Sequence, residues 1–329
     1  MRGWRSNRFL AQACLRGGGA AAYPSRMTAP SSAAAAAMSE TALPDEPLAL
    51  SAPLARAFAA TLCHVDPRHG GSCAWYHGLW QYLRLFDFVT TPRDHAAFYR
   101  AALLEPLRAG ARRVLISGTA DYALPACLLW LYRSAGVPVE MTVLDICRTP
   151  LRLCEWFADR IDTPIAAVAQ DILEYRPVEA FDVICTHAFL GRFQPAERAA
   201  LIARWHSLLR PGGRVVTVNR IRPDAPETVR FTAEQSARFV ERIRQAAQRA
   251  EPPLDLSADT LVAMAQAYVA AKRTVPLRST DELVAMFEGA GFRIEQLAVG
   301  AVEARTLRAP AGPTMSGGAQ YARIVAVRT

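Results

Sequence analysis

From about residue 110 onward, short apolar runs alternate with amphipathic segments. There are five such apolar runs, and the first three each end close to a glycine or an acidic residue, which is typical of buried strands. Between them, apolar residues recur every three or four positions, as they do in helices that cover a sheet. The alternation predicts a mostly parallel sheet with helices on both faces. The expected strands lie at residues 113–118, 139–145, 165–169, 181–186 and 214–219.

The pattern changes after the fifth expected strand. Residues 222–275 carry two long helical patterns separated by Pro252 and Pro253, and we expect them to form a helical insertion. A helix at 280–289 then precedes two late strands, which are joined by a Pro- and Gly-rich segment. These late strands predict an antiparallel hairpin at the sheet edge, so that the domain spans residues 111–329.

The part of the chain before residue 111 has a different character. Residues 45–110 show three helical patterns, at 47–63, 72–89 and 94–107, and they predict a helical cap. Residues 1–44 are rich in Ala, Gly, Ser and Arg and nearly free of acids. We expect a disordered tail or a start codon placed too early, and a mitochondrial transit peptide is the alternative for this composition.

Composition narrows the class of protein. Of the 329 residues 51% are hydrophobic and 21% charged, which supports a large core and excludes wholesale disorder. The formal net charge is +8, but half of it lies in the first 40 residues, and Lys272 is the only lysine among 38 basic residues. The arginine excess fits a GC-rich bacterial genome better than a nucleic-acid surface. We therefore expect a cytoplasmic protein that binds neither nucleic acid nor a membrane.

The seven cysteines contain no C-x-x-C pair and the six histidines no H-x-x-x-H pair. This spacing is typical of reduced thiols and carries no zinc signature. We therefore predict no metal site from spacing. Residues far apart in the sequence would have to converge to form one.

Ligands of parallel sheets bind at the carboxyl ends of the strands. The loop after the first expected strand contains Ser117, Gly118 and Thr119. Asp145 ends the second strand, 27 residues after Gly118, where an acid commonly binds ribose hydroxyls. Asp171 follows the third strand, where it can accept a hydrogen bond from an adenine amino group, although a turn-forming role is equally open. The pattern predicts a pocket for an adenosine moiety.

The order of several short motifs resembles that of the class I S-adenosylmethionine-dependent methyltransferases over residues 112–329. The motifs are Val114–Gly118, Leu144-Asp145, Gln170–Ile172, Phe181–Ile184, Leu209–Val216 and Thr280–Phe292. The resemblance implies a Rossmann-like sheet with its last strand antiparallel, S-adenosyl-L-methionine as cofactor and a small-molecule acceptor. It implies that Ser117, Gly118 and Thr119 lie at the methionine part, Asp145 and Ile146 at the ribose, Asp171 and Ile172 around the adenine, and His187 at the reacting end.

The first loop departs from the family pattern. Ile116 stands where an acid is usual, and Ala120 and Tyr122 stand where glycines are usual. A tyrosine at 122 should block a close approach to the backbone. We expect the methionine end to be held differently, with help from Asp121 or the N-terminal helices. The departure also leaves open a non-catalytic binding protein of the same fold.

An NAD(P)-dependent oxidoreductase of the short-chain type is a further alternative. Gly118, Ala120 and Ala123 imitate a weakened dinucleotide loop. Tyr268 and Lys272 form a Y-x-x-x-K pair, but they follow the fifth strand by about 50 residues, which is too far for that family. The other interpretation of this pair is one helix face with a solvated ammonium group.

The densest aromatic stretch, at residues 75–86, falls in the expected cap. Tyr76, Trp80 and Arg84 share a helical face and are candidate contacts to the acceptor, whereas the alternative is that the stretch packs the cap on the sheet. His77 and His187 are candidate general bases because histidine titrates near neutrality. The sequence predicts no oligomeric state.

Overall fold

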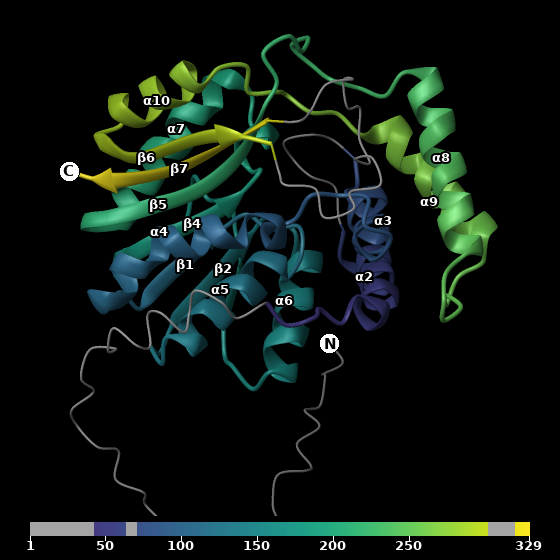
Figure 1. The fold of residues 1–329 in the computed structure, drawn as a ribbon, viewed down its shortest axis with the longest axis horizontal. Helices are drawn as coiled ribbons and strands as arrows, with labels where there is room; N and C mark the ends of the chain where they lie inside the picture. Colours follow the sequence, from purple (N-terminus) through teal and green to yellow (C-terminus); the bar gives the residue numbers. More distant parts are fainter. Residues whose placement is uncertain (1–42, 64–70, 302–319) are drawn as a thin grey trace, which may run out of the picture.

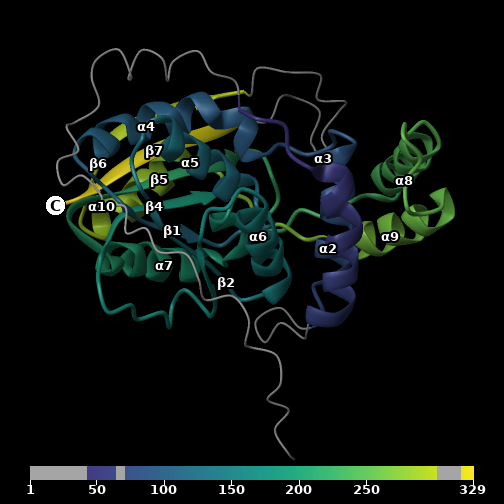
Figure 2. The same ribbon diagram turned by 90° about the horizontal axis from the view of Figure 1, so that it is seen from below.

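The computed structural model describes residues 43–63, 71–301 and 320–329. A central sheet separates two layers of helices, and a further group of helices lies beyond one end of the strands (Figures 1 and 2). The expected tail at 1–44 falls almost entirely outside the described residues, and so does the segment between the two late strands. The rest of the chain can be compared with the expectations from sequence.

The sheet has seven strands in the order β3-β2-β1-β4-β5-β7-β6. Strands β1 to β5 pair in parallel, whereas β7 is antiparallel to both β5 and β6. This is the predicted Rossmann-like class I methyltransferase sheet with its last strand reversed and a hairpin at the edge. The strands are β1 (Arg113–Ser117), β2 (Glu140–Asp145), β3 (Ala166–Ala169), β4 (Phe181–His187), β5 (Leu209–Ile221), β6 (Phe292–Gly300) and β7 (Gln320–Arg328).

The start of β5 differs from the expectation. The Pro-Gly-Gly turn does not precede the strand but bulges out of it, because Phe181 pairs with Leu209 and Val183 already pairs with Arg214. A Cβ atom on Gly213 would lie 2.9 Å from the Arg210 carbonyl oxygen and 3.0 Å from that of Asp182. The glycine is therefore required for the bulge to fit against β4.

Two apolar cores hold helices on the faces of the sheet. One face is covered by α4 (Ala96–Arg108), α5 (Ala123–Ser134) and α6 (Arg148–Arg160), and the other by α7 (Pro195–Leu208) and α10 (Thr280–Gly289). Short 3-10 turns, η1 (Pro92–His95) and η2 (Leu190–Arg192), precede α4 and follow β4. Helix α4 belongs to the segment in which we expected a cap, but its buried residues pack on the sheet.

A third apolar core lies beyond the carboxyl ends of the parallel strands. It joins α2 (Leu48–Leu62) and α3 (Ala74–Leu85) to α8 (Ala233–Gln248) and α9 (Ala258–Ala271). We call these four helices the lid (Figure 2). Helix α8 begins at Ala233, well inside the expected insertion, because Thr232 caps it, accepting a hydrogen bond from the Gln235 amide at 3.2 Å. The N-terminal segment and the insertion thus form one layer.

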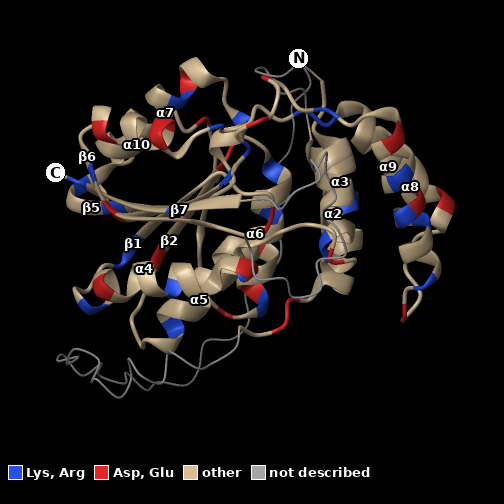
Figure 3. Cartoon of the chain, turned by 45° about the horizontal axis from the view of Figure 1, so that its top comes forward, with Lys and Arg blue, Asp and Glu red and all other residues tan. Residues whose placement is uncertain are grey.

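Charges of both signs lie along the lid helices (Figure 3). On α8, Arg238 pairs with Glu234 at 3.0 Å, and Arg244 reaches Asp259 at the start of α9 at 3.1 Å. These exposed pairs contribute little to stability. Among the described residues, no helix combines the length and the apolar character needed to cross a membrane.

Candidate functional site

A cavity of about 1070 Å³ lies between the carboxyl ends of the strands and the lid. It is lined by the loops after β1 to β5 and by residues of α3 and α9. All but one of the predicted site residues line it: Tyr76, His77, Trp80, Arg84, Gly118, Thr119, Asp145, Ile146, Asp171, Ile172 and His187. The exception is Ser117, which is fully buried and accepts a hydrogen bond from Trp205 Nε1 at 2.9 Å. Its predicted contact to a cofactor finds no support in this geometry.

Asp145 lies where the sequence predicted it, at the end of β2. Its Oδ2 accepts a hydrogen bond from the Thr119 amide at 3.0 Å, and its Oδ1 accepts one from the Cys147 amide at 2.8 Å. Burial raises the pKa of this carboxyl to about 6, although the two amides favour its charged form. Each oxygen keeps a further lone pair, so the carboxylate can still accept hydrogen bonds from a ligand.

Asp171 and its neighbour complete the wall beside Asp145. Asp171 Oδ1 accepts a hydrogen bond from the Leu173 amide at 3.0 Å, which is the turn-forming role left open by the sequence. Ile172 is 3% exposed, whereas Ile146 is 44% exposed, and both side chains border the cavity. The carboxylates of β2 and β3 therefore stand beside two apolar surfaces.

Gly118 has a left-handed backbone, with a φ of 73°. A Cβ atom here would lie 2.1 to 2.5 Å from ring atoms of Phe189, so any side chain at this position would force the ring to move. The aromatic ring, not open space, therefore covers the glycine. Phe189 itself lines the cavity, and nothing in the sequence pattern pointed to it.

We expected Tyr122 to block a close approach to the backbone of the first loop. Its side chain does not line the cavity. Its ring stacks on Phe157 with 4.7 Å between centroids, and its hydroxyl lies 2.9 Å from Ser51 Oγ on α2. The side chain is fully buried and is absent from the cavity wall. The residue that replaces a family glycine therefore joins the lid to the sheet.

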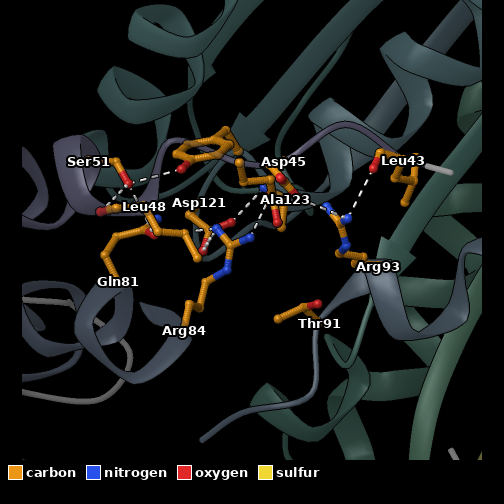
Figure 4. Close-up of polar contacts among 12 residues, drawn as sticks. Leu43, Asp45, Leu48, Ser51, Gln81, Arg84, Thr91, Arg93, Asp121 and Ala123 are labelled. Carbon is orange, nitrogen blue, oxygen red and sulfur yellow. Dashed lines mark hydrogen bonds and ion pairs between the residues drawn. The ribbon is translucent and has the colours of Figure 1, made fainter. Parts of the chain in front are cut away.

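A buried guanidinium also connects the lid to the first loop (Figure 4). Arg84 on α3 pairs with Asp121 at 3.1 Å and with Glu46 at 2.6 Å, and its side chain is 1% exposed. Asp121 also accepts hydrogen bonds from Trp80 Nε1 at 2.7 Å and from the Ala123 amide at 2.6 Å. Trp80 and Arg84, which we predicted as acceptor contacts, thus have their polar ends engaged with Asp121.

Aromatic and cationic side chains form the part of the cavity wall under the lid. Tyr76 stacks against Tyr268 with 6.3 Å between ring centroids. Two cations lie over the Tyr76 ring: Arg192 Cζ is 4.5 Å and Lys272 Nζ is 5.0 Å from its centre. Burial and the neighbouring Arg192 and Arg222 lower the pKa of Lys272. Lys272 is half-buried, and its ammonium group lies against an aromatic ring of the cavity wall, a contact that the alternative interpretation did not expect.

Two polar residues that sequence reasoning missed lie at the end of β5. Asn219 is 1% exposed and donates to Thr217 Oγ1 at 2.9 Å, while its Oδ1 has no hydrogen-bond partner. The Nε of Arg220 is also buried without a partner. Both residues line the cavity. Because unpaired buried polar atoms are costly, this end of β5 is suited to a polar ligand group.

His187 ends β4 and contacts Tyr99, whose hydroxyl lies 3.2 Å from His187 Nδ1 and donates to the Thr186 carbonyl at 3.0 Å. The Tyr99 hydroxyl proton is donated to the Thr186 carbonyl, so the hydroxyl oxygen must accept a hydrogen bond from His187 Nδ1. The proton of the neutral ring is then on Nδ1, and Nε2 keeps its lone pair. Burial lowers the pKa of His187 to about 3. The ring is neutral and is a weak base.

His77 lies at the other side of the cavity among three cysteines. Its Nδ1 is 3.3 Å from the sulfur of Cys63 and 3.5 Å from that of Cys147, and the sulfur of Cys73 is 3.5 Å from that of Cys147. Although burial opposes the charge, the two thiol contacts raise the pKa of His77 to about 9. A protonated imidazole does not act as the general base that we predicted here.

This cluster could not be read from cysteine spacing, because its members come from three separate segments. Cys63 follows α2, Cys73 precedes α3, and Cys147 follows β2. One local signal was available, since Cys73 and His77 are four residues apart and share a helix face. Neither a C-x-x-C nor an H-x-x-x-H search detects that pair.

No family model matches the sequence, and neither does any curated protein. Solved structures are similar, among them 1,6-didemethyltoxoflavin-N1-methyltransferase from Burkholderia thailandensis, with 16% identity over 88% of this chain and 93% of that one and a TM-score of 0.48. N-methyltransferase NodS from Bradyrhizobium japonicum is 13% identical over 77% of this chain and 98% of its own, with a TM-score of 0.45. The chain spans 58% of the methyltransferase SibL, with 16% identity and a TM-score of 0.42.

These likenesses concern the fold alone. The strand order and the reversed β7 define the class I methyltransferase fold without them. A reversed strand inserted between β5 and β6 does not belong to the dinucleotide-binding order 3-2-1-4-5-6, and Tyr268 of the Y-x-x-x-K pair is packed among aromatic rings. Both observations disfavour the oxidoreductase alternative.

Replacing the buried guanidinium tests its role in holding the lid. Arg84→Met leaves Asp121 and Glu46 without their partner, so we expect the free energy of unfolding to fall by about 3–5 kcal/mol. The control, Arg238→Met, breaks an exposed pair and should change it by less than about 1 kcal/mol. Urea denaturation measures both. If both substitutions lower the free energy of unfolding by the same amount, Arg84 does not have this role in holding the lid.

His95 provides a test of burial behind His187. Burial, together with the neighbouring His187 and the Arg323 guanidinium, lowers the pKa of His95 to about 2. Below the ordinary pKa of histidine, therefore, only the unfolded chain takes up the proton. Stability should therefore decrease on acidification, by about 2 kcal/mol for this residue at about pH 5. In His95→Asn, which keeps an acceptor for Arg323 Nε, urea denaturation should show that much less pH dependence. If the stability of His95→Asn depends on pH as strongly as that of the wild-type protein, a neutral, buried His95 is refuted.

Proposed function

We propose that the protein transfers a methyl group from S-adenosyl-L-methionine to a small-molecule acceptor. One observation carries the proposal. Asp145 and Asp171, at the ends of adjacent strands, line the same cavity as the loop after β1, within a sheet whose β7 is reversed. In parallel sheets this is the edge at which nucleotides bind.

The residues present fit the adenosine part of such a cofactor. Asp145 is held by the Thr119 and Cys147 amides, and its remaining lone pairs suit the two hydroxyls of a ribose. Ile146 and Ile172 provide apolar surfaces for the faces of an adenine ring, and Asp171 provides an acceptor for its amino group. The required pocket is thus assembled from three consecutive strand ends.

The methionine part has different surroundings from those implied by the family pattern. Phe189 covers Gly118, and Asp121 is already engaged with Arg84 and Trp80. We infer that Phe189, from the segment after β4, and the Thr119–Asp121 segment of the first loop support this part of the cofactor, while Asp121 mainly anchors the lid. This arrangement accounts for the loss of the usual glycines.

The bound cofactor would supply an electrophilic methyl group on a sulfonium. The lid covers the ends of the strands, and the wall of Tyr76, Trp80 and Tyr268 is suited to orient a planar acceptor for in-line attack. His187, neutral and with its Nε2 lone pair, can accept a hydrogen bond but takes a proton poorly. The site therefore suits acceptors that arrive deprotonated.

The charges of the wall favour the same acceptors. Arg192, Arg220, Arg222 and Lys272 all line the cavity, and the Nε of Arg220 is buried without a partner. An anion would relieve the repulsion that lowers the pKa of Lys272. We therefore propose an aromatic acceptor that carries a carboxylate or a phenolate group.

Calorimetric titration of the full chain with S-adenosylhomocysteine tests the cofactor proposal. We expect one site, and we expect Asp145→Ala to weaken binding by about 1–3 kcal/mol through loss of the ribose hydrogen bonds. Asp159→Ala, an exposed substitution on α6, is the matched control and should leave the affinity unchanged. Thermal unfolding of each variant shows whether the fold is intact.

Two outcomes would overturn this proposal. A folded wild-type chain that binds neither S-adenosylmethionine nor S-adenosylhomocysteine would exclude it, and binding of NAD(P) in their place would restore the oxidoreductase alternative. An Asp145→Ala variant with wild-type affinity would show that the ribose lies elsewhere.

Matched probes test the anionic acceptor. With S-adenosylhomocysteine present, benzoate should raise the unfolding temperature more than benzamide, which has the same shape without the charge. The preference should disappear in Arg220→Met and persist in Arg238→Met, an exposed site on α8. Equal shifts from both probes in the wild-type protein would contradict an anionic acceptor.

A further inference from the structure

The cysteine cluster beside the cavity is not used by the proposed methyl transfer. It contains Cys63, Cys73, His77 and Cys147, whose ligand-type atoms all lie within 4.8 Å of one another. These residues are brought together by the packing of α2 and α3 on the loop between β2 and α6. The chain separation is as large as 84 residues, between Cys63 and Cys147.

Four of the six distances among these atoms are close to those around a tetrahedral ion, and the other two are within 4.8 Å. With bonds of about 2.3 Å to sulfur and about 2.0–2.1 Å to nitrogen, a zinc tetrahedron has edges of about 3.8 Å between sulfurs and about 3.6 Å between sulfur and nitrogen. The observed sulfur–sulfur distances are 3.7 Å for Cys63–Cys147 and 3.5 Å for Cys73–Cys147. The distances from His77 Nδ1 are 3.3 Å to Cys63 and 3.5 Å to Cys147.

The surroundings also suit a metal better than a disulfide. Cys147 has two sulfur neighbours at nearly the same distance, so the geometry selects no single pair. The imidazole nitrogen points into the group, which a disulfide would not require. The hydroxyl of Thr149, a fully buried residue, lies 3.2 Å from the Cys63 sulfur, where it can donate to a metal-bound thiolate.

We propose that Cys63, Cys73, His77 Nδ1 and Cys147 bind one Zn²⁺ ion in a closed tetrahedral site that fastens the lid to the loop between β2 and α6. Three thiolates and one imidazole are a typical donor set for structural zinc, and four protein ligands leave no open coordination position. Binding releases the thiol protons and the proton on His77 Nδ1 to solvent, because only thiolates and a neutral imidazole bind the ion. The site is independent of the identity of the cofactor.

The position of the site gives it a structural consequence. Three ligands belong to the lid: Cys63 directly follows α2, Cys73 directly precedes α3, and His77 lies in the first turn of α3. Cys147 belongs to the strand-end loop, where its amide donates to Asp145 at 2.8 Å. The ion would therefore cross-link the lid to the residue proposed to bind the ribose.

Metal analysis of the full chain, purified without a metal-binding tag, tests the proposal directly. We expect one zinc per chain by plasma mass spectrometry in the wild-type protein. Cys63→Ala, which replaces a partly exposed ligand, should lose it. Cys154→Ala is the control, because this buried cysteine on α6 lies outside the cluster, and it should keep one zinc per chain.

Cobalt titration of the reduced, metal-free wild-type chain keeps the proposal falsifiable if a variant fails to fold. Co²⁺ should produce the intense visible bands of tetrahedral sulfur coordination with a one-to-one endpoint, and added Zn²⁺ should abolish them. Cys63→Ala should bind Co²⁺ at least tenfold more weakly. Absence of these Co²⁺ bands in the wild-type chain would overturn the proposal.

Chelation links the ion to the lid. A strong chelator should lower the unfolding temperature of the wild-type protein and of Cys154→Ala but leave Cys63→Ala unchanged. Equal responses of the three proteins would overturn the structural role. Alkylation and mass spectrometry of cell extracts prepared under reducing conditions provide a further check. A Cys63–Cys147 disulfide found there would exclude the metal site.

Discussion

The architecture depends on how four lid helices are held over the ends of a parallel sheet. Arg84 does this from within the protein: it is buried between Asp121 of the first loop and Glu46 before α2. An unpaired guanidinium in this position would carry a large desolvation cost, so lid and loop are stable only when joined. Tyr122 adds a second connection through Ser51 on α2. The cavity exists because these contacts close it on one side.

The same contacts explain why the first loop departs from the pattern of the family it resembles. Asp121 and Tyr122 are used to anchor helices, and Phe189 covers Gly118. Where the family pattern has a glycine-rich loop with accessible backbone, this loop carries side chains that stabilise the lid. The carboxylates of β2 and β3 are unaffected by this exchange, because they are positioned by the parallel register of the strands.

Much of the fold could be predicted from sequence because it follows from local patterns. Runs such as Val114–Ile116 and Val183–Cys185 are apolar on both faces, as strands buried in a sheet must be, and their positions were predicted within a few residues. Asp145 and Asp171 could be placed by the same reasoning, since strand ends share an edge. The start of β5 was missed because the Pro-Gly-Gly segment bulges from the strand, which depends on its partner β4.

The features that were missed depend on tertiary packing. Three such features join residues from distant segments: the contact between Lys272 and the Tyr76 ring, the ring of Phe189 over Gly118, and the cluster around Cys147. No periodicity in one sequence encodes such contacts. His77 shows the difference clearly, because its residue type suggested a base while its neighbours make it a candidate metal ligand.

A crystal structure of the full chain with S-adenosylhomocysteine tests the central claim most directly. The account predicts density for the adenosine at the ends of β2 and β3, with the ribose hydroxyls on Asp145 and the adenine between Ile146 and Ile172. Adenosine bound elsewhere, or a ribose that makes no contact with Asp145, would contradict it.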